Sequence, residues 1–171
     1  NELLIKKLVA QKENIVLVGM PGCGKTTVGQ LLAKKLDRIF VDTDDEISIS
    51  DGKSAGDIII GRGEVYFREL ETSICKELGK RNSLVIATGG GAVLKKENIR
   101  ALKQNGKIIF IERPIHLLST KGRPLSQKKK SLRELYENRI SLYDKYSDIS
   151  IKNDGLPEES VVKILEFLDL L

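Results

Sequence analysis

The sequence predicts an α/β domain in which a parallel β-sheet is covered by helices on both faces, and two observations support this fold class. Short apolar runs rich in β-formers alternate with longer segments that repeat apolar residues at helical spacing, as in strand–helix–strand units. The apolar runs are nearly continuous, which is typical of strands buried on both faces. The length of 171 residues suits one such domain.

The expected elements follow from these two patterns. The predicted strands are Asn14–Val18, Ile39–Val41, Leu84–Ala87, Lys107–Ile111 and Asp148–Ile151. The predicted helices are Lys25–Leu36, Gly63–Lys80, Lys95–Gln104, Leu132–Tyr143 and Glu158–Leu170. Two remaining segments are rich in Gly and Ser or in basic residues, and they are interpreted as excursions from the sheet: Ser48–Gly63 and Leu118–Ser131. Both would lie near the carboxyl ends of strands, where such folds bind ligands.

Composition and charge exclude several classes of partner. Hydrophobic residues make up 40% and charged residues 31%, and no apolar run approaches the about 18 residues of a membrane span. The first residues are too charged for a signal peptide, so we expect a cytoplasmic protein without a membrane partner. The net charge is +5, but the basic residues are dispersed and aromatic residues are only 5%. We therefore expect no nucleic-acid partner, and the surplus charge suits small anionic ligands.

Cysteine and histidine supply little catalytic chemistry. Cys23 and Cys75 have no metal-ligand spacing and are expected to be free thiols. His116 is the single histidine, which excludes catalysis by several histidines. The chain begins with Asn1 rather than Met, so it can be a piece of something longer.

A phosphate-binding loop is predicted between the first strand and the first long helix. The segment Gly19–Thr27, GMPGCGKTT, fits the P-loop motif G-x-x-x-x-G-K-[ST]. Its glycines let main-chain N–H groups close around phosphate oxygens, and the helix N-terminus adds partial positive charge. We therefore expect ATP to contact Gly22, Cys23, Gly24, Lys25, Thr26 and Thr27.

Two residues of this loop have specific expected roles. Lys25 can reach the β- and γ-phosphates, and the Thr26 hydroxyl can coordinate Mg²⁺. The alternative is a chance Gly-rich turn, but a strand before the loop and an amphipathic helix after it favour the motif. Cys23 is expected to be a small side chain in a crowded loop rather than a reactive thiol.

Acidic residues follow the second strand, in VDTDDE at Val41–Glu46. Residues two apart in an extended chain face the same way, so Asp42 and Asp44 are expected to point together toward the nucleotide. Phosphoryl transfer to an alcohol uses one carboxylate near magnesium and another that accepts or orients the hydroxyl proton. The alternative is that one aspartate only caps the next helix, and we expect Asp45 to be the cap.

Two arginines lie on or beside apolar helix faces. Arg139 falls within the apolar stripe of its helix, and Arg68 flanks Glu71, which lies on the stripe of an earlier helix. A buried guanidinium needs an anionic partner, and Arg68 and Glu71 are spaced to pair with each other. A structural ion pair is therefore one interpretation. The other is that the two arginines bind the carboxylate of a substrate.

Three consecutive glycines, Gly89–Gly91, follow Thr88 at the end of the third strand. Such a segment lets a ligand approach the main chain closely. A flexible turn is the alternative, although three glycines are more than a turn requires.

Taken together, these segments resemble the shikimate kinase family. They are GMPGCGKTT, DTD at Asp42–Asp44, GEVYFRELE at Gly63–Glu71, ATGGG at Ala87–Gly91, GRPLS at Gly122–Ser126 and ENRISLY at Glu137–Tyr143. The resemblance implies a P-loop NTPase fold of the nucleoside-monophosphate-kinase type, with a five-stranded parallel sheet flanked by helices. It also implies a single domain at 14–171 after an N-terminal extension at 1–13, with a substrate-binding excursion at about 44–72 and a lid at about 118–130.

The resemblance further implies an activity, the phosphorylation of the 3-hydroxyl of shikimate by ATP with Mg²⁺, in aromatic amino acid biosynthesis. The family's shikimate contacts correspond to Asp44, Arg68, Gly90 and Arg139, with Asp44 as the candidate base. Thr26 corresponds to the Mg²⁺ ligand, and Asp42 to a residue that binds the ion through water. Arg123 corresponds to a lid arginine that contacts the ATP phosphates, so the expected catalytic residues are Lys25, Asp44 and Arg123.

Some features differ from the family. The lid segment Leu117–Arg123 is short and lacks an arginine that many members have there, from which the lid contacts adenine. An isoleucine near Asp57–Ile60 stands where an aromatic residue is expected, and residues 1–13 can be the remnant of a fusion. Two alternatives stay open: a related kinase for another small hydroxylated acid such as gluconate, and a nucleotide-binding switch without acceptor chemistry. We expect the protein to act as a monomer.

Overall fold

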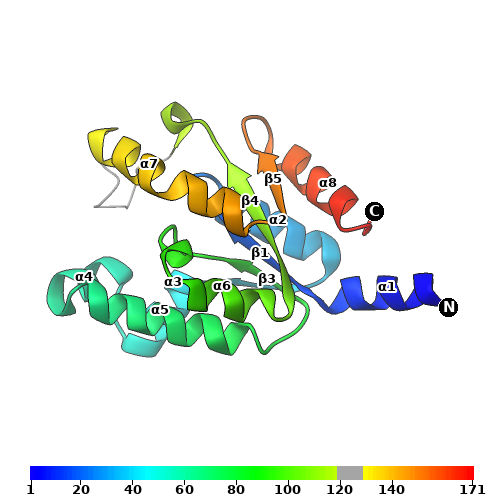
Figure 1. Ribbon diagram of the computed structural model, residues 1–171, viewed down its shortest axis with the longest axis horizontal. Coiled ribbons are helices and arrows are strands. Elements are labelled where there is room, and N and C mark those ends of the chain that lie inside the picture. Colours follow the sequence, from blue (N-terminus) through cyan, green and yellow to red (C-terminus); the bar gives the residue numbers. More distant parts are fainter. Residues whose placement is uncertain (119–128) are drawn as a thin grey trace.

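The computed structural model describes residues 1–118 and 129–171. Its centre is a five-stranded, all-parallel sheet in the order β2-β3-β1-β4-β5 (Figure 1). The strands are β1 (Asn14–Val18), β2 (Ile39–Asp42), β3 (Leu84–Ala87), β4 (Gly106–Glu112) and β5 (Ile149–Lys152). The predicted parallel sheet is confirmed, and each strand lies within one residue of its predicted bounds at either end.

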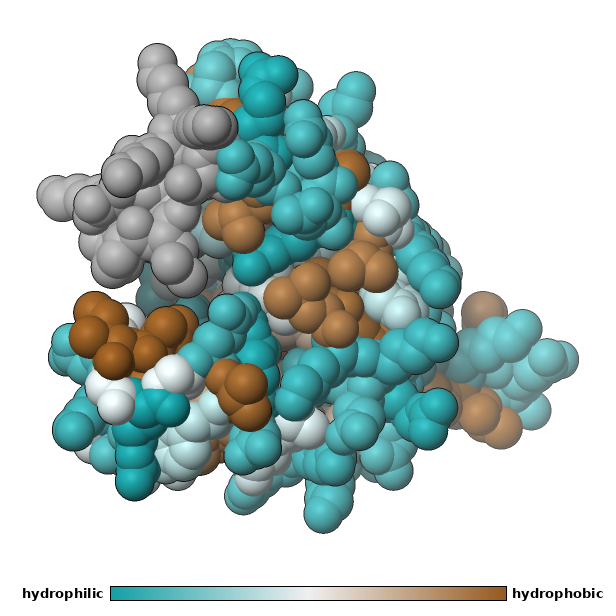
Figure 2. Space-filling model, turned by 60° about the vertical axis from the view of Figure 1, so that its left-hand side comes forward, coloured by the Kyte–Doolittle hydropathy of each residue, from teal (hydrophilic) through white to brown (hydrophobic). Residues whose placement is uncertain are grey.

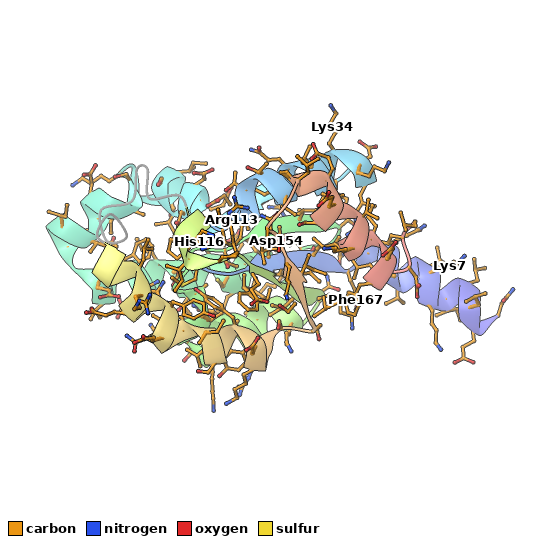
Figure 3. The ribbon with its side chains drawn as sticks, turned by 90° about the horizontal axis from the view of Figure 1, so that it is seen from above. Lys7, Lys34, Arg113, His116, Asp154 and Phe167 are labelled. Carbon is orange, nitrogen blue, oxygen red and sulfur yellow. The ribbon has the colours of Figure 1, made fainter. Side chains whose placement is uncertain are left out.

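Helices cover both faces of the sheet. Seen from above in Figure 3, α2 (Lys25–Leu36) and α8 (Pro157–Phe167) lie on one face, and α6 (Lys96–Lys103) and α7 (Lys129–Tyr146) lie on the other. The long helix α5 (Glu64–Leu78) packs against α6. Two short 3-10 turns, η1 (Ala92–Leu94) and η2 (Ile115–Leu117), follow β3 and β4. The predicted helices are all present: α2 has its predicted bounds, and the other four have shifted ends.

The central strand β1 is buried along its whole length, and it carries the P-loop at its carboxyl end. Val16 of β1 lies opposite Ile86 of β3 and Ile108 of β4, and all three side chains are fully buried. Helix α2 approaches this layer closely because it has a glycine at position 29, where a Cβ would come 2.5 Å from the ring of Phe40. The P-loop therefore joins two tightly packed elements.

The segment between β2 and α5 differs from its prediction. Two short helices, α3 (Thr43–Asp51) and α4 (Ala55–Arg62), occupy much of this excursion, although the predicted helix ranges included none between β2 and α5. Gly52 separates them with a φ of +79°, and the Ser54 hydroxyl caps α4 by accepting from the N–H of Asp57 at 3.2 Å. The helices are short, so their caps define them better than their apolar periodicity does.

The cap of α3 also corrects a prediction. Asp42, not Asp45, is the N-cap: its Oδ1 accepts from the N–H of Asp44 at 2.9 Å and from that of Asp45 at 3.4 Å. The helix begins directly after β2, one turn earlier than we expected, and the last residue of the strand is therefore in the cap position.

The N-terminal helix α1 (Glu2–Lys12) projects from the rest of the molecule (Figure 1) and buries none of its residues. Its exposed side chains include the large apolar ones of Leu3, Leu4, Ile5, Leu8 and Val9. Brown surface is visible on the segment at the right of Figure 2. Its end is held by Arg38, whose guanidinium donates to the carbonyls of Gln11 at 2.7 Å and Glu13 at 2.8 Å. Among the described residues, no helix is long and apolar enough to cross a membrane.

Candidate active site

The P-loop has a main-chain conformation that requires its glycines. Gly22 and Gly24 have φ angles of +80° and +98°, in the left-handed region that residues with a Cβ adopt at an energetic cost. Gly24 is also the N-cap of α2, so the loop leads directly into a helix N-terminus, where free N–H groups favour anions. This geometry matches the predicted phosphate-binding loop.

Lys25 lies inside the loop in this structure. Its Nζ donates to the carbonyls of Gly19 at 2.8 Å and Met20 at 2.9 Å, and the residue is only 7% exposed. The ammonium group has three protons, and the two carbonyls and Sγ of Cys23 account for all three, so it must give up at least one of these contacts to bind a phosphate. Cys23 is buried beside it, with Sγ 3.6 Å from Nζ, which agrees with the expected small side chain in a crowded loop. Both cysteines are free thiols, as predicted.

A first cavity of about 240 Å³ opens over the loop. It is lined by Gly22, Gly24–Thr27, Asp42, Asp44 and Thr88–Gly90. The Thr26 hydroxyl donates to Oδ2 of Asp42 at 3.5 Å, while Oδ1 of the same carboxylate caps α3. These ligands are all oxygen atoms, as Mg²⁺ prefers, and that ion takes its other ligands from phosphates and water. The residues present thus fit the predicted magnesium site.

A second cavity of about 390 Å³ adjoins the first. The two share Asp42, Asp44, Gly89 and Gly90 in their walls, so the predicted aspartate pair lies where they meet. The reason for this convergence differs from our prediction. Asp42 ends β2 but Asp44 already belongs to α3, so the turn from strand to helix brings them together rather than the alternation of an extended chain.

Arg68 reaches the second cavity from α5 and makes an ion pair beneath it. Its Nη1 donates to Oε1 of Glu71 at 2.9 Å, and its Nη2 lies 3.3 Å from Oε1 of Glu64. Burial raises the pKa of Glu71 above its ordinary value, and the positive charge of Arg68 opposes that shift. The structural ion pair therefore exists, and the same guanidinium also lines the cavity.

Arg139 reaches the same cavity from α7, on the opposite side of the glycine segment, and is 8% exposed. The inward orientation that we predicted from helical periodicity is confirmed for both arginines. The two guanidinium groups and Asp44 are thus contributed by three separate helices to one small space.

Each glycine of Gly89–Gly91 touches one of these three side chains. A Cβ at Gly89 would come 2.7 Å from Oδ1 of Asp44, and one at Gly90 would come 3.2 Å from Nη1 of Arg139. A Cβ at Gly91 would overlap the guanidinium of Arg68. The segment is therefore more than a flexible turn, because its missing side chains make room for the charged groups around the cavity.

Two residues that hold this glycine segment were not predicted. The Tyr143 hydroxyl donates to the carbonyl of Gly90 at 2.6 Å, and the Thr43 hydroxyl accepts from the N–H of Gly89 at 2.9 Å. Burial raises the pKa of Tyr143 above its ordinary value, so its hydroxyl stays protonated as a donor. The sequence did contain one indication for Tyr143: it lies four residues after Arg139 and so on the same face of the helix.

A third cavity of about 790 Å³ lies at the carboxyl ends of β4 and β5, where Figure 3 labels Arg113, His116 and Asp154. The Arg113 guanidinium joins the two chain segments, since it donates to the carbonyls of Asn153 at 2.6 Å and Leu117 at 3.1 Å. The predicted lid residue Arg123 lies outside the described residues.

A P-loop whose phosphate cavity continues into a charged acceptor pocket, on a five-stranded parallel sheet, defines a small-molecule kinase. Comparison with known sequences identifies the particular kind. The profile of the family described as "Shikimate kinase" matches residues 21–169, and the chain belongs to this family.

Individual relatives agree with this assignment. The chain is 38% identical over 162 residues to a shikimate kinase of Clostridium botulinum, which covers 92% of this chain and 98% of that protein. The solved structure of a shikimate kinase from Acinetobacter baumannii in complex with shikimate matches with a TM-score of 0.88 and 38% identity, over 95% of this chain and 96% of that one. A gluconokinase structure from Sinorhizobium meliloti, at a TM-score of 0.60 and 16% identity over 92% of this chain and 91% of that one, shares the fold alone.

Proposed function

We propose that this chain transfers the γ-phosphoryl group of ATP to the 3-hydroxyl of shikimate, yielding ADP and shikimate 3-phosphate. The observation that carries the proposal is the meeting of one aspartate, Asp44, and two inward arginines, Arg68 and Arg139, in a pocket that adjoins the phosphate cavity. This set of groups suits an acceptor that has both a carboxylate and a hydroxyl, as shikimate has.

Each group has a distinct part in binding the acceptor. The guanidinium of Arg139, together with the part of Arg68 that does not face Glu71, binds the carboxylate of shikimate through charge-assisted hydrogen bonds. Asp44 then accepts a hydrogen bond from the acceptor hydroxyl. Because Asp44 lies in the walls of both cavities, this contact places the hydroxyl oxygen next to the γ-phosphate.

The phosphate side neutralises negative charge. The main-chain N–H groups of the P-loop bind the phosphates, and Lys25 turns from the carbonyls of Gly19 and Met20 toward the transferred group. Thr26 would hold Mg²⁺ directly and Asp42 would hold it through water, and the bound ion would supply charge neutralisation there. Arg123, which lies outside the described residues, stays a prediction as an arginine that contacts the ATP phosphates. The third cavity, beside Arg113, is the space available to the base of ATP.

The orientation by Asp44 can be sufficient without full proton removal. The transition state of phosphoryl transfer is loose, so little negative charge develops on the attacking oxygen before the bond forms. Asp44 therefore acts first as an orienting group and takes the proton late in the transfer.

The test is an acceptor-dependence assay with the wild-type chain. ADP release is measured with shikimate, with its methyl ester, with gluconate and without acceptor, and the product is identified by phosphorus NMR. We expect ADP release with shikimate but not with gluconate or without acceptor. With the methyl ester the rate of ADP release should be much lower, because the ester lacks the charge that the arginines bind. Equal release without acceptor would instead support a nucleotide switch or simple ATPase, and preference for gluconate would support the related kinase. A monomeric state and a cytoplasmic location stay predictions.

A further inference from the structure

Asn153, the first residue after β5, is buried and touches the P-loop from behind. It is 3% exposed, and its side-chain Nδ2 donates to the carbonyl of Cys23 at 2.8 Å. On its other side, Oδ1 accepts from the hydroxyl of Ser160 in α8 at 2.9 Å. The amide group is therefore held between the loop and a helix, which fixes which end of the amide faces the loop.

The main chain of Asn153 is fixed as well. Its N–H donates to the carbonyl of Glu112 at 2.8 Å, and its carbonyl accepts from the guanidinium of Arg113 at 2.6 Å. Both partners belong to the end of β4 and the turn after it, beside the labelled Arg113 and Asp154 in Figure 3. The main chain of Asn153 is therefore anchored by contacts that do not involve the P-loop.

The bond to Cys23 determines the orientation of the next N–H group. In a trans peptide, the carbonyl of one residue and the N–H of the next point in opposite directions. Asn153 holds the Cys23 carbonyl on the side of β5 and α8, so the N–H of Gly24 points away from them. Gly24 lines the phosphate cavity, and as the N-cap of α2 it has an N–H that no helical carbonyl satisfies.

The Asn153 amide also lies close to Gly24 itself. A Cβ at Gly24 would come 2.5 Å from Nδ2 of Asn153, so the amide occupies the space that a side chain would need. Gly24 has a φ of +98°, and this left-handed conformation is what turns the peptide between the amide and the cavity.

We propose that Asn153 is a positioning residue for phosphoryl transfer: by holding the Cys23 carbonyl, its amide aims the Gly24 N–H at the phosphates of the nucleotide. The proposal rests on the proposed function only in that the P-loop binds these phosphates. An aspartate at this position would place an oxygen against the Cys23 carbonyl, and an alanine would leave that carbonyl without its donor.

The experiment compares three variants of the full chain. Asn153→Asp keeps the shape but replaces the donor, and Asn153→Ala removes the amide. The matched control is Asn14→Ala: Asn14 is also fully buried, donates to the carbonyl of Arg81 at 2.8 Å and accepts from the N–H of Leu84 at 2.9 Å, but it lies at the amino end of β1. For each, we measure the Kd for inorganic tripolyphosphate and for ADP with Mg²⁺, KM for both substrates, and the melting temperature.

We expect both Asn153 variants to raise the Kd for tripolyphosphate and for ADP about tenfold, which is the effect of losing one hydrogen bond to a charged group. KM for shikimate should stay within about twofold. Asn14→Ala should lower the melting temperature about as much as the Asn153 variants do, and it should leave both dissociation constants unchanged. A purely structural role for Asn153 predicts that its variants bind like the control, and that result overturns the proposal.

Two further outcomes are informative. Weaker binding of ADP with unchanged binding of tripolyphosphate would show that Asn153 affects the adenine base rather than the phosphates, and that result also overturns the proposal. If both Asn153 variants fail to fold, Ser160→Ala removes the bond that orients the amide, together with a longer bond of 3.5 Å to the carbonyl of Lys152. It should weaken the binding of tripolyphosphate about two- to threefold, and unchanged binding would contradict us. Failure of the wild-type chain to bind either ligand would instead reject the proposed function.

Discussion

The donor and acceptor sides of this site are built in different ways. The phosphate cavity depends mostly on one continuous segment, the P-loop, which joins the buried strand β1 to the closely packed helix α2. The acceptor pocket draws on α3, α4, α5, α7 and the glycine segment after β3. Its excursion has a small core of its own, formed by Ile47, Ile58 and Phe67. Substitutions of P-loop side chains should therefore affect chemistry with little change in stability, whereas on the acceptor side a substitution that also disturbs a buried contact should affect both.

The largest expected effect tests the donor side. Lys25→Ala should lower kcat by about 100- to 1000-fold, because it removes the positive charge that stabilises the transferred group. The melting temperature should change little, since the loop stays anchored by β1 and α2. Steady-state rates and a thermal melt check this, with the exposed Lys34→Ala on α2 as the control. Turnover close to wild type would contradict the role of the P-loop lysine.

A second substitution lies where the two cavities meet. Asp44→Asn keeps the shape of the side chain but removes the charge that orients the acceptor hydroxyl, so kcat should fall about 100-fold. KM for ATP should change by less than about threefold. Asp57→Asn removes the same charge from an exposed position of α4 and is the matched control. If ATP affinity falls while shikimate kinetics are unchanged, Asp44 belongs to the donor side.

Substitutions of the two arginines distinguish a role in substrate binding from a role in stability. Arg68→Lys and Arg139→Lys keep the charge but lose the planar fork, so each should raise KM for shikimate about tenfold and leave KM for ATP nearly unchanged. Only Arg68→Lys should also lower the melting temperature clearly, because it disturbs the pair with the fully buried Glu71.

Arg62→Lys, on the more exposed side of α4, is the control for both arginine variants. Both Michaelis constants are measured together with the melting temperature. Equal losses for both substrates, accompanied by lower stability, would show that the arginines are only structural.

The smallest expected effect concerns the support of the glycine segment. Tyr143→Phe removes the hydroxyl that donates to Gly90 but keeps the ring stacked on Phe110, with centroids 5.1 Å apart. Loss of one hydrogen bond, about 1 kcal/mol, should lower the melting temperature by about 2–4 °C and raise KM for shikimate two- to fivefold. A melt and a shikimate titration check this. A change in KM for ATP alone would place the effect on the donor side instead.

The sequence predicted the donor side better than the acceptor side for a physical reason. β1 and β3 have the predicted bounds because continuous apolar runs identify strands buried on both faces. The P-loop was equally clear because its glycines and lysine are contiguous. The inward orientation of Arg139 was predicted from periodicity, since an 18-residue helix shows its faces over several turns.

What the sequence did not predict depends on distant contacts or on short elements. Helices of nine and eight residues, α3 and α4, have too few turns to show a periodic face. The target of the Tyr143 hydroxyl is 53 residues away, and the carbonyl bonds of Lys25 depend on how the loop closes. Asp42 was assigned to the magnesium site, but nothing local showed that it also ends β2 as a helix cap.

That double use of Asp42 links the two sides of the site. One carboxylate oxygen holds the first turn of α3, which carries Asp44, and the other faces Thr26 in the P-loop. Any ligand that turns this carboxylate would shift the first turn of α3 and, with it, the acceptor pocket. By thermodynamic linkage, acceptor binding would then change the affinity for the nucleotide by the same factor. Binding of the two substrates would therefore be cooperative even though the protein groups that contact each are largely separate.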